Sequence, residues 1–90
     1  MKQKEGFVLR EVCGQNVIVG EGLEAINFGK LLTMNETATW LWKKGQELGN
    51  FTIEELAEGL CKAYNVSADE ARQDVAELID VWQKAGVIED

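Results

Sequence analysis

Cys13 and Cys61 are the side chains of this chain that could act as thiolate nucleophiles or soft metal ligands. They stand far apart and form no C-x-x-C pair. We therefore expect two separate reduced thiols, with a disulfide or a shared metal as the alternative. Histidine is absent, which removes the commonest general base and the imidazole metal ligands. No glycine-rich phosphate loop, H-E-x-x-H motif or nucleophile elbow is present. The sequence argues against a free-standing enzyme, and it suggests neither catalytic residues, nor a metal, nor a cofactor.

The composition narrows the class of protein and of partner. The chain has 90 residues, of which 46% are hydrophobic, so we expect one domain spanning residues 1–90 with one modest core. A formal net charge of -7 disfavours nucleic acid and anionic membranes, because a binder must offset phosphate charge. It is compatible with a basic or neutral partner. No run of 18 apolar residues and no signal-peptide h-region occurs, so we expect a cytoplasmic protein without a transmembrane helix.

Strand-like segments fill the first third of the chain. Residues 7–12 (FVLREV) alternate in part, and NVIVG at 16–20 is rich in β-branched residues. CGQN lies between them and has turn-forming residues, so the two segments predict a hairpin. Three glycines within residues 20–30 indicate a looser connection. Residues 30–34 (KLLTM) then predict a third strand.

Three helices should follow, because three residues that can cap a first turn precede segments of helical periodicity. Asn35 would cap a helix over about 36–47, and GQELGN from residue 45 on should break it. Thr52 and Ser67 each begin a capping box, for helices over about 53–64 and 68–85, and Gly86 should end the last. The apolar residues at helical spacing should face the core: Ala38, Leu41, Trp42, Ile53, Leu56, Ala57, Leu60, Tyr64, Ala71, Val75, Leu78, Ile79 and Trp82. The sequence predicts an α+β fold, a three-stranded antiparallel sheet followed by three helices.

One flank of the last helix is more apolar than a solvated face requires. A second stripe, formed by Asp74, Leu78, Val81 and Ala85, lies beside the core stripe. Val81 could simply be a single exposed valine, since isolated surface apolar residues are normal. Alternatively, this flank lines a groove.

The predicted third strand lacks the usual protection of a sheet edge. Residues 31–34 contain no charge and no proline, although proteins commonly use these to blunt an open edge. An open edge can accept a guest strand through main-chain hydrogen bonds. We expect a groove with Leu31, Leu32 and Thr33 on one wall and Asp74, Leu78 and Val81 on the other, where Asp74 could pair with a Lys or Arg of the guest. The strand register is left open, and a well-packed corner of the core is the simpler interpretation of the same stretch.

The order and spacing of these stretches resemble those of the PqqD family, the proteins named for coenzyme PQQ synthesis protein D. The matching motifs are L-x-x-M-N-E-T-A-x-x-L-W at 31–42, T-x-E-E-L at 52–56, V-S-A-D-E-A-x-x-D-V-x-x-L-I at 66–79 and A-G-V-I at 85–88. Met34 stands where the family usually has leucine. The resemblance covers nearly the whole chain, although each motif alone is also typical of ordinary helix caps and core positions.

The resemblance implies a RiPP recognition element, a winged helix-turn-helix-like domain that binds the leader segment of a ribosomally made precursor peptide. In the family the leader adds as a strand beside the third strand and packs against the third helix. The domain then presents it to a modifying enzyme on another chain, often a radical SAM protein. The expected peptide-binding residues are Lys30, Leu31, Leu32, Thr33, Met34, Asp74, Leu78, Val81 and Ala85. Nothing in the sequence indicates that the precursor is that of PQQ.

Three rival interpretations follow from the same elements. A winged-helix DNA-binding protein would share the topology, but five acids against two bases on the last helix would repel phosphate. An acyl or peptidyl carrier protein would need a serine for phosphopantetheine, and Ser67 already serves as a helix cap. A homodimer could form through the same open edge and would compete with a peptide.

Overall fold

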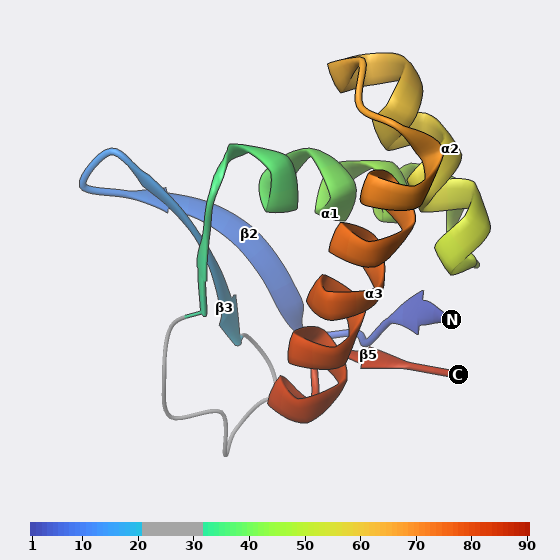
Figure 1. The fold of residues 1–90 in the computed structure, drawn as a ribbon. Helices are drawn as coiled ribbons and strands as arrows, with labels where there is room; N and C mark the ends of the chain where they lie inside the picture. The colour runs from blue at the N-terminus through green and yellow to red at the C-terminus, as the bar shows by residue number, and fades with distance from the viewer. Residues whose placement is uncertain (21–31) are drawn as a thin grey trace.

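The computed structural model describes residues 1–20 and 32–90 (Figure 1). Its larger sheet is antiparallel with the strand order β2-β3-β4. Three helices follow that sheet along the chain. The bounds are β2 Phe7–Val12, β3 Gln15–Gly20, β4 Leu32–Met34, α1 Glu36–Leu48, α2 Ile53–Tyr64 and α3 Ala68–Ala85. The predicted α+β architecture is confirmed. Within the described part of the chain, none of the helices is both long and apolar enough to cross a membrane.

The predicted hairpin forms with a two-residue loop. Val12 pairs with Gln15, and Cys13 and Gly14 between them have φ angles of 53° and 80°. Two successive positive φ values are typical of the type I′ turn, whose twist matches that of the flanking strands. Gly14 suits the second position because it lacks a Cβ. β3 therefore begins at Gln15, one residue earlier than the sequence predicts.

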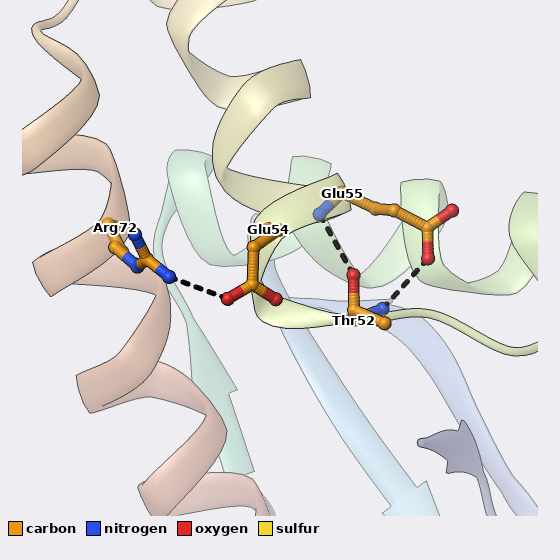
Figure 2. Close-up of polar contacts among 4 residues, drawn as sticks. All are labelled: Thr52, Glu54, Glu55 and Arg72. Atoms are coloured by element: carbon orange, nitrogen blue, oxygen red, sulfur yellow. Dashed lines mark hydrogen bonds and ion pairs between the residues drawn. The ribbon is translucent and has the colours of Figure 1, made fainter.

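Each predicted N-cap residue caps its helix, but of the two predicted capping boxes the one at Thr52 is complete and the one at Ser67 has the first of its two hydrogen bonds alone. The Ala38 N–H donates to Asn35 Oδ1 at 2.7 Å, and the Glu70 N–H donates to Ser67 Oγ at 3.2 Å. Thr52 and Glu55 form a complete capping box, with both hydrogen bonds at 3.1 Å (Figure 2). Because side-chain oxygens satisfy the first N–H groups, the start of each helix is fixed by a local sequence signal.

The helix predicted over about 36–47 is confirmed as α1, which ends at Leu48 with Gly49 as its C-cap, inside the GQELGN stretch. Gly45 is buried inside the helix, and a Cβ there would lie only 3.2 Å from two ring atoms of Phe51. The glycine therefore permits the close approach of a large aromatic ring rather than ending the helix.

The core lies where the three helices meet the inner face of the sheet. Trp42 of α1 and Trp82 of α3 pack edge to face at its centre, with ring centroids 5.2 Å apart. Most of the residues predicted to face inward are buried, and Ile53, Tyr64 and Leu78 are half-buried against this cluster. Phe51, which lies in the connection before α2, is only 1% exposed and was not predicted as a core residue.

A second small sheet joins the two ends of the described chain. β1 (Lys2–Gln3) pairs antiparallel with β5 (Ile88–Glu89), and the two chain ends lie near each other in Figure 1. The Gln3 side chain also donates a hydrogen bond to the Trp42 carbonyl at 2.7 Å. The sequence predicts that Val87 and Ile88 pack on the core, and both are buried, but it does not predict this strand pair.

Candidate functional site: a groove beside the edge of β4

The hairpin determines which backbone N–H and C=O groups of β4 face β3 and which face away from it. In a two-residue loop, the closing pair Val12 and Gln15 exchanges hydrogen bonds, so the Gln15 backbone faces β2. Backbone direction alternates along a strand, so Asn16 and Ile18 face β4 instead. Their partners are Met34 and Leu32. The Leu32 and Met34 backbones therefore bond to β3.

Thr33 consequently directs its backbone N–H and C=O away from β3. Among the described strands, β4 lies at the end of the sheet order, so these two groups face its open edge. The Thr33 side chain is exposed, whereas Met34 is buried in the core. Thr33 is thus the residue of β4 that offers a donor and an acceptor to a further strand.

A groove of about 400 Å³ begins where β4 ends and runs along α3. It is lined by Asn35 and residues of the first turns of α1 on one side, and by residues of α3 on the other. These are Asn35, Thr37, Ala38 and Leu41, facing Asp74, Glu77, Leu78 and Val81. Ala38 and Leu41 are buried and supply an apolar floor, while the two acids are exposed at the rim.

Val81 is the most exposed large apolar side chain of α3. It is 47% exposed, and it shares the groove with half-buried Leu78. Apolar surface that stays open beside a buried floor gains free energy when a partner covers it. The flank of α3 therefore has the shape and the chemistry to receive apolar side chains.

The structure brings together only some of the site residues expected from the sequence. Asp74, Leu78 and Val81 line one groove, but the wall opposite them is Asn35 and the start of α1 rather than β4. Ala85 is half-buried against the core and is not among the lining residues. Thr33 and Met34 border a separate hollow at the hairpin side. Lys30 and Leu31 lie outside the described residues.

Asn35, Thr37 and Glu77 were not among the expected site residues. Asn35 and Thr37 belong to the helix cap and first turn, which sequence reasoning treated as structural only. Glu77 could have been found from its position, because it lies three residues after Asp74 and four before Val81 on the same helical flank.

The thiols are not part of this groove. Cys13 is exposed at the hairpin loop, Cys61 is half-buried, and both are free. Cys61 borders a different, apolar hollow of about 350 Å³ between α2 and α3. In the part of the chain that the structure describes, no cluster of His, Cys, Asp and Glu is arranged to hold a metal ion.

Comparison with known proteins decides the family. The family model described as coenzyme PQQ synthesis protein D (PqqD) matches residues 10–88 of this chain. The chain belongs to the PqqD family. A search of curated proteins gives no match.

Two solved structures share the PqqD-like fold of this chain. One is TbiB1 in complex with the TbiA(beta) leader peptide, with a TM-score of 0.79 and 16% identity over 99% of this chain and 95% of the other. The second is lasso peptide synthetase B1 complexed with the leader peptide, with a TM-score of 0.77, 16% identity and coverage of 99% and 96%. At this identity the likeness concerns the fold.

Proposed function

We propose that this PqqD-family domain binds the leader segment of a ribosomally made precursor peptide by strand addition to β4. The observation that supports this most directly is the Thr33 backbone, which faces the side of β4 that pairs with none of the described strands, next to an apolar groove. Main-chain bonds at the edge would supply affinity, and the groove would select side chains. Both solved relatives of this fold were determined with leader peptides.

The domain acts as a non-catalytic peptide chaperone in this proposal. It holds the leader while a modifying enzyme on another chain, such as a radical SAM protein, acts on the remainder of the precursor. A second copy of the domain could pair through the same edge, in which case dimer formation and leader binding would compete. Light scattering with and without peptide measures this competition.

The charges on α3 favour a peptide over DNA as the partner. Its two bases are both engaged, since Arg72 pairs with Glu54 at 2.7 Å and Lys84 pairs with Asp80 at 2.9 Å. A helix that enters the major groove needs cations directed at phosphate. A winged-helix DNA-binding protein would need unpaired bases on this helix, and both bases of α3 are in ion pairs.

A two-dimensional NMR titration of labelled protein with a candidate leader peptide tests the proposal. We expect the largest shifts at β4, at Asn35 and along α3 from Asp74 to Val81. Shifts centred on the exposed face of α2 instead would contradict the site.

A pair of matched variants separates the groove from the rest of the surface. Val81→Glu places a charge in the groove and should weaken leader binding by tenfold or more. Val12→Glu is the control, because Val12 is similarly exposed, at 42% against 47%, but lies at the hairpin tip. Equal affinity of both variants for the leader, measured by calorimetry, would exclude the groove as the binding site.

A further inference from the structure

We propose that the groove selects leader segments that carry a Lys or Arg two residues away from an apolar residue. This inference rests on the proposed function and specifies which peptides the site accepts. The cation would lie beside Asp74 and Glu77, and the apolar side chain would lie on Leu41, Leu78 and Val81. All of them line one groove, and along α3 the two acids precede the two apolar residues, so a single strand that follows the helix can contact both.

The two groove acids differ from the other charges of α3. Asp80 pairs with Lys84 at 2.9 Å, and Arg72 is held by Glu54 of α2 at 2.7 Å (Figure 2). Asp74 and Glu77 take part in none of the ion pairs or side-chain hydrogen bonds of the described residues. The bases that α3 could have offered them are engaged elsewhere. Two uncompensated carboxylates at the rim therefore favour a cationic guest.

The apolar part of the groove is continuous with the protein core. Leu41 is 1% exposed and forms its floor, Leu78 is half-buried, and Val81 is the open side chain at its rim. An anionic guest residue would lose water here and would lie in a groove that also carries two carboxylates. This part of the groove should accept an aliphatic or aromatic side chain.

The spacing of the two parts matches the side-chain repeat of a strand. Leu78 follows Asp74 by four residues, and Val81 follows Glu77 by four, which is about 6 Å along a helix axis. Residues two apart on one face of a strand are about 6.6 Å apart. In Figure 1 the trace of residues 32–34 leads up into α1 whereas α3 descends, so the two point in opposite directions in this view. A guest strand that runs along α3 can place alternate side chains against the two parts in turn.

Binding selection from a display library of random 12-residue peptides tests the inference and does not require the natural leader sequence. We expect enrichment of Lys or Arg two positions from an apolar residue. One enriched peptide is then measured against the protein by fluorescence anisotropy. Replacing its cation by glutamine should weaken binding roughly threefold to tenfold, and added salt should reduce the difference.

Two double variants test whether Asp74 and Glu77 cause the preference for a cationic peptide. D74N/E77Q should show the same threefold to tenfold loss and should no longer distinguish the lysine peptide from the glutamine peptide. D69N/E58Q removes the same two kinds of acid from exposed positions outside the groove lining, and it should bind the lysine peptide like the unmodified protein. Thermal unfolding checks that both variants fold.

The outcomes separate the two proposals. If peptides without a cation are selected and still shift the NMR signals of β4 and α3, the proposed preference for a cation is wrong and the proposed function stands. The same conclusion follows if the two double variants bind the lysine peptide equally. If no peptide perturbs β4, strand addition itself is refuted, and the inference fails with it.

Discussion

The substitution Thr33→Pro tests the backbone geometry at the centre of the proposed site. Leu32 and Met34 bond to β3, so the Thr33 N–H is the β4 donor on the side where none of the described strands pairs with β4. Proline lacks this N–H and is tolerated on edge strands where the N–H faces solvent. We therefore expect the sheet to survive and the guest strand to lose one main-chain hydrogen bond.

The size of the effect follows from the cost of an unmatched carbonyl. A main-chain hydrogen bond contributes about 0.5–1.5 kcal/mol net, and a buried partner left unsatisfied costs about 1–3 kcal/mol. A total loss of about 1–3 kcal/mol weakens binding about fivefold to more than a hundredfold. Thr33→Val is the matched control, because it keeps the N–H and a β-branched shape, and its affinity should stay within about twofold.

Calorimetry with a leader peptide measures both variants, and urea unfolding confirms that each is folded. A complementary readout leaves the protein unchanged: N-methylation of the peptide, one residue at a time, should abolish binding at alternate positions near the centre. If Thr33→Pro binds as tightly as Thr33→Val while both are folded, the guest does not pair with β4. The groove could then bind peptide only through side chains.

Three further predictions concern the scaffold. Gly45→Val should lower the free energy of unfolding by about 1–3 kcal/mol in urea titrations, because its side chain would overlap the buried Phe51 ring, already 3.2 Å from a Cβ at that position. Thr52→Ala should lower it by about 0.5–2 kcal/mol through loss of the capping box, with Thr52→Ser close to unchanged. The pKa of Glu54 is lowered from its ordinary value of 4.5, first by a hydrogen bond from its own backbone N–H and then by Arg72. The ionised form therefore stabilises the fold above about pH 4.5, and Glu54→Gln and the unmodified protein should converge in stability as the pH falls below it.

Local signals in the sequence were sufficient for the helices and the hairpin. Asn35, Thr52 and Ser67 act at short range on the three or four residues that follow them, so their caps can be read without tertiary information. The apolar period then determines which face of each helix is buried. The PqqD motifs are built largely from these same capping and core positions, which is why the fold and the family could both be predicted.

Long-range contacts account for what the sequence did not reveal. β1 and β5 are two residues each and pair across almost the whole chain, so neither has a pattern of its own. Gly45 looks like a helix breaker until the Phe51 ring is placed against it. The groove wall formed by Asn35 and Thr37 depends on how α1 crosses α3, which no single segment specifies.

The orientation of Thr33 shows how a distant turn can set the chemistry of a binding edge. The two-residue loop at Cys13 and Gly14 makes Gln15 face β2, and alternation along β3 then decides which β4 residues are bonded. The side-chain pattern agrees, since Leu32 and Met34 pair with Ile18 and Asn16 on the core side of the sheet. A loop that shifted β3 by one residue would reverse the backbone alternation and turn the Leu32 and Met34 groups outward. Thr33 then could not offer its N–H to a guest. Loop length at residues 13–14 is therefore a condition for strand addition at β4, although the loop itself does not border the groove beside α3.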